Sequence, residues 1–128
     1  MLIGVLAALL SGCSQHPPAP QRITADLNGK AVTLKPEQEL VVLLKANPTT
    51  GYAWAIAEVN DAVLQQTGMG GYTPEPATQR IVGAGGLAEF HFRAVAPGTT
   101  MLRLVYRRPW ETSAPPVQAF TLKVDVQP

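Results

Sequence analysis

The chain has 128 residues, a net charge of +1 and only 15% charged residues. This length suits one domain, and the near-neutral charge gives no field that would draw the protein to nucleic acid. A single cysteine excludes an internal disulfide, so packing and backbone hydrogen bonds must hold the fold.

The N-terminal segment predicts export. The stretch from Leu2 to Leu10 is almost entirely apolar, but it is too short to span a bilayer, which takes about 20 residues. It is typical of the core of a signal peptide. The tetrad Leu10-Ser11-Gly12-Cys13 resembles the bacterial lipobox, in which the cysteine becomes the lipidated first residue. The alternative is a plain secretory signal with a chance cysteine.

We therefore expect residues 1–12 to be a lipoprotein signal peptide and Cys13 to carry the lipid. The protein would then be lipid-anchored in the cell envelope, at the outer membrane or in the periplasm. The alternative is a secreted protein. Residues 13–21 contain Pro17, Pro18 and Pro20, which favour an extended tether. Residues 22–128 would form the domain.

Strands are predicted along the domain, because apolar residues recur with a period of two or in short runs between turn residues. Asn28-Gly29 predicts a hairpin between Ile23–Leu27 and Ala31–Leu34. The type of Ala62–Gln66 is undetermined, and Met69–Arg80 is expected to be irregular. Further strands are predicted at Glu39–Ala46, Tyr52–Val59, Leu87–Val95, Thr99–Arg107 and Val117–Val126.

About seven or eight strands with this spacing indicate an all-β sandwich of two sheets. The apolar run in Glu39–Ala46 suits a strand buried on both faces or one at the centre of the sandwich. In Leu87–Val95 the alternation places Phe90 and Phe92 on one face and Glu89 and His91 on the other. The predicted core comprises Leu43, Trp54, Ile56, Phe90, Phe92, Leu102, Leu104, Phe120 and Leu122.

Catalytic and metal-binding groups are sparse. Of the two histidines, His16 lies in the tether and His91 on an outward face, so neither is placed as a base for a nucleophile. Nine scattered acidic residues do not suggest a metal site. The small basic patch of Arg103, Arg107 and Arg108 lacks aromatic partners, which argues against nucleic acid. We expect no enzyme activity, no metal and no cofactor.

Three loops carry more than a sandwich requires. Asn47-Pro48-Thr49-Thr50-Gly51-Tyr52-x-Trp54 presents two threonines on a stiff turn, with Trp54 expected in the core. Gly83-x-Gly85-Gly86 suits a close approach of another backbone, and a mobile loop is the alternative. Arg108-Pro109-Trp110 puts an aromatic on a proline-stiffened loop, typical of an interface anchor, although a core tryptophan is the alternative.

In this order, NPTTGYAW, GAGG and RPW resemble the signature of the chagasin family, the inhibitors of papain-like cysteine peptidases. The resemblance covers about Ile23 to Val126. It implies an immunoglobulin-like sandwich whose three loops gather at one end and bind a papain-like cysteine peptidase reversibly and competitively, as a monomer. The residues expected to bind the peptidase are Asn47, Pro48, Thr49, Thr50, Gly51, Tyr52, Gly83, Gly85, Gly86, Arg108, Pro109 and Trp110.

The resemblance also implies a role for each loop. Asn47–Gly51 would enter the centre of the peptidase cleft, with Thr49 and Thr50 nearest the catalytic pair. Residues 83–86 would run beside the substrate-binding strands, and Trp110 would pack on the opposite rim. The competing hypothesis is an envelope lipoprotein whose immunoglobulin-like module binds another envelope or surface protein.

Overall fold

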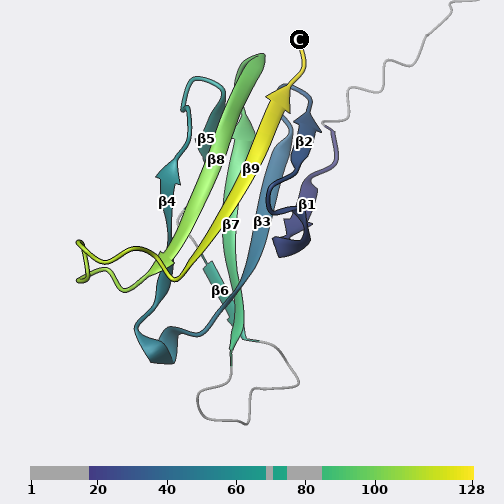
Figure 1. Cartoon of the computed structure of the whole chain (residues 1–128). Helices are drawn as coiled ribbons and strands as arrows, with labels where there is room; N and C mark the ends of the chain where they lie inside the picture. Colours follow the sequence, from purple (N-terminus) through teal and green to yellow (C-terminus); the bar gives the residue numbers. More distant parts are fainter. Residues whose placement is uncertain (1–17, 69–70, 75–84) are drawn as a thin grey trace, which may run out of the picture.

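The computed structural model describes residues 18–68, 71–74 and 85–128, and these residues form two facing β-sheets (Figure 1). The first sheet has the order β1-β3-β7-β5, with β6 also paired to β7, and the second has the order β2-β9-β8-β4. The described strands are β1 (Gln21–Thr24), β2 (Ala31–Leu34), β3 (Glu39–Ala46), β4 (Ala53–Glu58), β5 (Leu64–Gln66), β6 (Gly71–Pro74), β7 (Gly86–Ala94), β8 (Gly98–Arg107) and β9 (Gln118–Val126). Two short 3-10 helices, η1 (Ala25–Leu27) and η2 (Pro48–Thr50), lie between strands. The predicted all-β sandwich is confirmed.

The core lies between the sheets and is built from alternate residues of the long strands. Most of its predicted members are buried, while Trp54 and Ile56 are partly buried and pack against it. Leu43 was wrongly expected there: it is half-buried, and Leu44 is 1% exposed in its place. Glu39 and Lys45, the charged residues of this strand, lie in the same phase of the alternation as Leu43. The period of two therefore already placed Leu43 outward and Leu44 inward, and the expectation overlooked it. The central buried side chains are Leu40, Val42, Leu44, Phe92, Leu102, Leu104, Phe120 and Leu122.

Strand β3 is buried on its inner face, whereas on its outer face only Val41 is fully buried, Leu43 is half-buried and Lys45 is exposed, so the prediction of burial on both faces holds only in part. Val41, on the face away from the core, is only 2% exposed. Its cross-strand neighbours are Arg22 on β1 and His91 on β7. Nδ1 of His91 in turn lies 2.8 Å from a carboxylate oxygen of Glu39. Polar side chains on this outer face therefore surround the buried Val41.

The hairpin predicted at Asn28-Gly29 is wrong. β1 pairs in parallel with β3 of the first sheet, and β2 pairs in parallel with β9 of the second. The turn therefore carries the chain from one sheet to the other. Gly29, at φ +79°, donates its N–H to the carbonyl of Thr121 at 2.7 Å. The turn residues were identified correctly, but the long strands of the two sheets offer better partners than β1 and β2 offer each other.

Two shorter segments differ from the sequence expectation or complete it. Gly71–Pro74, within the stretch expected to be irregular, forms β6 and pairs antiparallel with β7. This strand was not predicted because it begins with glycine and ends with proline, two residue types that are uncommon in strands. Leu64–Gln66, in the segment of undetermined type, forms β5.

The chain enters the fold at Gln21, where β1 begins. The predicted signal peptide and Cys13 lie outside the described residues. Within residues 18–68, 71–74 and 85–128, no helix has the length and apolar character to cross a membrane.

Candidate functional site

Register brings the three predicted loops to one end of the sandwich. Ala46, the last residue of β3, pairs with Gly86, the first residue of β7. In the other sheet, Ala53 at the start of β4 pairs with Arg107 at the end of β8. The loops that leave these four positions therefore start at the same end, which is the lower end in Figure 1.

The first loop is held compact by Asn47. Its side-chain oxygen accepts hydrogen bonds from the N–H of Thr49, at 3.2 Å, and from the Thr49 hydroxyl. Its main-chain oxygen accepts from the N–H of Thr50 at 3.2 Å and from the Thr50 hydroxyl at 2.7 Å. Pro48 fixes φ at the start of η2. Thr49 and Thr50 thus lie exposed on a turn in which their own N–H groups are bonded to Asn47.

The third loop packs on the first. Gly51 has φ +81°, and a Cβ placed on it would lie 2.7 Å from Cη2 of Trp110. Trp110 is nevertheless 68% exposed, so one part of its ring touches the first loop while most of it faces solvent. The prediction that Trp110 is exposed is confirmed, and the core alternative is wrong.

Arg108 ties the two loops together. Its Nε donates to the carbonyl of Thr50 at 3.3 Å, its Nη1 lies 3.1 Å from a carboxylate oxygen of Glu111, and its guanidinium lies 4.6 Å from the ring centre of Tyr52. The hydrogen bond to Glu111, followed by the charge interaction with Tyr52, raises the pKa of Arg108 above its ordinary value. Arg107 donates a hydrogen bond to the main-chain oxygen of Glu111. Both Arg107 and Arg108 are therefore bonded to other groups of the same chain.

An aromatic stack lies beneath these loops. Tyr52 stacks on Tyr106 with ring centres 5.5 Å apart, and Tyr106 meets Trp54 at 5.0 Å. The Tyr106 hydroxyl accepts a hydrogen bond from the N–H of Asn47 at 3.0 Å. The stack therefore joins the second sheet to the root of the first loop.

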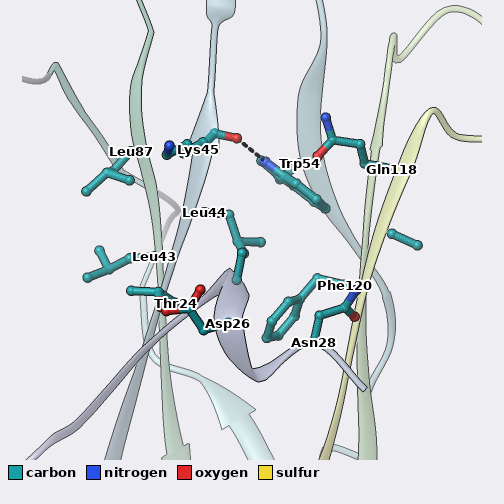
Figure 2. A pocket seen from close by; sticks show the side chains of 12 residues that line it. Thr24, Asp26, Asn28, Leu43, Leu44, Lys45, Trp54, Leu87, Gln118 and Phe120 are labelled. Carbon is teal, nitrogen blue, oxygen red and sulfur yellow. Dashed lines mark hydrogen bonds between the residues drawn. The ribbon is translucent and has the colours of Figure 1, made fainter. Parts of the chain in front are cut away.

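Trp54 links the two sheets at the same end. Its indole N–H donates to the carbonyl of Lys45 on β3 at 3.0 Å, drawn as the dashed line in Figure 2. It borders a cavity of about 390 Å³ between the sheets, which Leu44 and Phe120 also line. Trp54 is held by this hydrogen bond, by the contact with Tyr106 and by its packing against the core.

The second loop is described from Gly85 onward. A Cβ on Gly85 would lie 3.0 Å from the carbonyl oxygen of Ala46 and 4.0 Å from Cβ of Asn47. Its backbone therefore passes directly against the root of the first loop, whereas the predicted approach of a partner's backbone to the glycines stays a prediction. Gly83 lies outside the described residues.

The structure thus brings together the predicted residues that it describes. Their contact with a peptidase is untested and stays a prediction. Sequence reasoning missed Tyr106 as a part of the site, because its hydrogen bond with Asn47 spans 59 residues. It also assigned no partner to Glu111, which accepts a hydrogen bond from Arg108. A tyrosine one residue before the end of a strand was the available signal, because a buried tyrosine hydroxyl usually finds a partner. In the described part of the chain, no group of three or more His, Cys, Asp or Glu residues is placed to hold a metal ion.

Comparison with known proteins decides the family. The family model described as "Chagasin family peptidase inhibitor I42" matches residues 33–124. The chain belongs to the chagasin family. Amoebiasin-1 of Entamoeba histolytica is 32% identical over 105 residues, which cover 82% of this chain and 98% of that protein. Chagasin of Trypanosoma cruzi is 30% identical over 105 residues, covering 79% of this chain and 93% of its own.

Among solved structures, the crystal structure of the cysteine protease inhibitor EhICP2 from Entamoeba histolytica matches with a TM-score of 0.72 at 25% identity. It covers 85% of this chain and 96% of that one. These chagasin-family relatives confirm the predicted immunoglobulin-like sandwich. They also confirm the predicted class, a cysteine peptidase inhibitor rather than an enzyme.

Proposed function

We propose that the three-loop end fills the active-site cleft of a papain-like cysteine peptidase, reversibly and in competition with substrate. The observation that carries this proposal is the joining of Thr50, Trp110 and Gly85 at one end, through direct contacts of their loops. Thr49, Thr50 and Trp110 are exposed there, although the loops beneath them are bonded internally.

Pre-ordering of the loops favours tight binding. Ordering a flexible side chain on association costs about 0.5–1.5 kcal/mol, and ordering a loop adds to that. The hydrogen bonds of Asn47 and the contacts of Arg108 already fix the first and third loops in the free protein. More of the contact energy is then retained as affinity.

The same geometry explains how the inhibitor would escape cleavage. Clefts that bind peptides along a sheet edge take extended backbone. Pro48–Thr50 is instead a 3-10 turn closed by the carbonyl of Asn47. Its peptide bonds are therefore not presented as a strand to the catalytic cysteine.

Titration of papain with the purified full-length protein tests this function. We expect competitive inhibition, full recovery of peptidase activity on dilution, and an inhibitor of unchanged mass after long incubation. Absence of inhibition at micromolar protein, or progressive cleavage within residues 47–51, would contradict the proposal. Capture of another envelope protein without peptidase binding would favour the competing adhesive function.

Trp110→Ala should weaken this inhibition strongly. An aromatic anchor contributes about 2 kcal/mol or more, which corresponds to about a thirtyfold rise in the inhibition constant. Val95→Ala is the matched control, since Val95 is 41% exposed and follows the end of β7 opposite the site. Equal inhibition constants for the two variants would exclude Trp110 from the interface.

We also propose that Cys13 carries a lipid that holds the protein in the cell envelope. Its support is the sequence Leu10-Ser11-Gly12-Cys13 and the position where the chain enters the fold. Gln21 pairs with Leu40, near the start of β3, whereas the candidate site follows the end of β3 (Figure 1). An anchor at Cys13 would therefore be attached at the end of the sandwich opposite the three loops.

Metabolic labelling with an alkyne fatty acid in a bacterial host tests the anchor. We expect label on the wild-type protein, recovered in the membrane fraction, and none on Cys13→Ser. A soluble, unlabelled wild-type protein would support the plain secretory signal instead.

A further inference from the structure

Tyr106 contacts both the first and the third loop. It lies in β8 opposite Trp54 on one side and Gln118 on the other, and its side chain is 7% exposed. Its hydroxyl accepts the N–H of Asn47, and its main-chain oxygen accepts the N–H of Val117 at 3.0 Å, where the third loop returns to β9. A single residue therefore bonds the start of one loop and the end of the other.

The hydrogen bond from Asn47 to Tyr106 lies where the first loop leaves the β-sheet. The ladder between β3 and β7 ends at Ala46 and Gly86, so Asn47 is the first residue beyond it. Asn47 accepts four hydrogen bonds from the backbone and hydroxyl groups of Thr49 and Thr50. A shift of Asn47 would consequently move both threonines together.

The ring of Tyr106 is itself held firmly enough to act as a reference point. Tyr52 stacks on it, and Trp54, fixed by its bond to the Lys45 carbonyl, meets it at an angle of 38°. Two neighbouring rings and the β8 backbone thus leave the hydroxyl little freedom. Since the side chain is buried, it is not itself placed to contact a partner.

We propose that the Tyr106 hydroxyl is a positioning group that fixes the threonine turn in its binding-competent conformation. This inference rests on the proposed function for its effect on inhibition, but its structural part concerns the free protein alone. Without the hydroxyl, only a fraction of molecules would hold the turn correctly. The apparent inhibition constant rises as that fraction falls.

Tyr106→Phe tests the proposal, because it removes one oxygen and keeps the ring. The net contribution of one hydrogen bond corresponds to a rise of about three- to tenfold in the inhibition constant for papain. We expect this rise to come from slower association with little change in dissociation, since a buried positioning group acts before contact, whereas loss of a direct contact mostly speeds dissociation. Tyr72→Phe is the matched control: it makes the same chemical change on a ring that is 39% exposed on β6.

Amide hydrogen exchange in the free full-length protein supplies a readout that a general loss of stability would not reproduce. In Tyr106→Phe, exchange should accelerate at Asn47, Thr49 and Thr50 and stay unchanged in β3 and β9. Unchanged exchange at these three amides, or an unchanged association rate constant, would overturn the proposal. So would an equal effect of Tyr72→Phe.

The wild-type protein alone keeps the proposal testable should Tyr106→Phe fail to fold. Its Asn47 amide must then exchange more slowly than an exposed amide such as that of Gly68, and rapid exchange at Asn47 would overturn the inference. If the wild-type protein inhibits no papain-like peptidase, the proposed function fails, whereas the difference in exchange at Asn47, Thr49 and Thr50 between the free wild-type protein and free Tyr106→Phe still decides whether Tyr106 holds the turn.

Discussion

Gly51 lies where the first and third loops touch. It needs the left-handed backbone region at φ +81°, and it leaves room for the ring of Trp110. An L-residue at this position would be strained, because its Cβ disfavours this φ, and the same Cβ would clash with the indole ring of Trp110. This glycine therefore determines how closely the two loops pack.

Gly51→Ala should lower the free energy of unfolding by about 1–2 kcal/mol through backbone strain, and it should also weaken papain inhibition by displacing Trp110. Gly29→Ala separates the two effects. Gly29 has φ +79°, but a Cβ there has nothing within 4 Å. Chemical denaturation should show a similar loss for both variants, while only Gly51→Ala changes inhibition. Unaltered inhibition by Gly51→Ala would contradict the packing described here.

Arg108 was expected to contact the peptidase, and the structure shows it bonded to three groups of its own chain. Only a planar guanidinium with several donors can serve Thr50, Glu111 and the Tyr52 ring together. Its main contribution would then be to hold the third loop against the first.

Arg108→Lys should keep the charge yet raise the inhibition constant about three- to tenfold, because an ammonium cannot replace the fork of donors. Arg103→Lys, an exposed change on the outer face of β8, should have no effect. The inhibition constants of the two variants for papain, measured at two salt concentrations, test this expectation. Full activity of Arg108→Lys would show that charge alone suffices at this position.

At the scale of elements, β3 shows what a sequence can and cannot indicate. Its bounds, Glu39 to Ala46, were predicted correctly because the apolar run is bordered by turn residues. The inward face was predicted wrongly, although Glu39 and Lys45 share the face of Leu43 and the period of two therefore pointed to Leu44. The partners of β1 and β2 could not be predicted in this way, because pairing over long separations leaves no local pattern.

Leu44→Ala and Leu43→Ala test this facing directly. Leu44 is 1% exposed in the core, so its truncation should cost about 2–5 kcal/mol of stability. Leu43 is half-buried on the outer face, and its truncation should cost less than half as much. Urea denaturation of both variants gives the answer, and a larger loss for Leu43→Ala would contradict the observed register.

At the scale of the whole molecule, antiparallel register decides where the candidate site lies. The motif residues of the first and third loops and Gly85 and Gly86 at the start of β7 were predictable from the sequence, because loops carry distinctive turn chemistry. Their mutual support was not: Tyr106 bonds Asn47 across the sandwich, and Arg108 bonds Thr50 in a loop 58 residues away in the sequence. The family resemblance identified the activity, and the structure shows how the end of the fold could support it.

Hydrogen exchange of the inhibitor, free and bound to papain, shows whether the three loops form the contact surface. Papain should slow exchange at residues 47–52, 85–86 and 108–111 and leave the opposite end, around Val95 and Gly98, unchanged. Slowed exchange centred on the outer face of either sheet, with the three loops unaffected, would contradict this expectation.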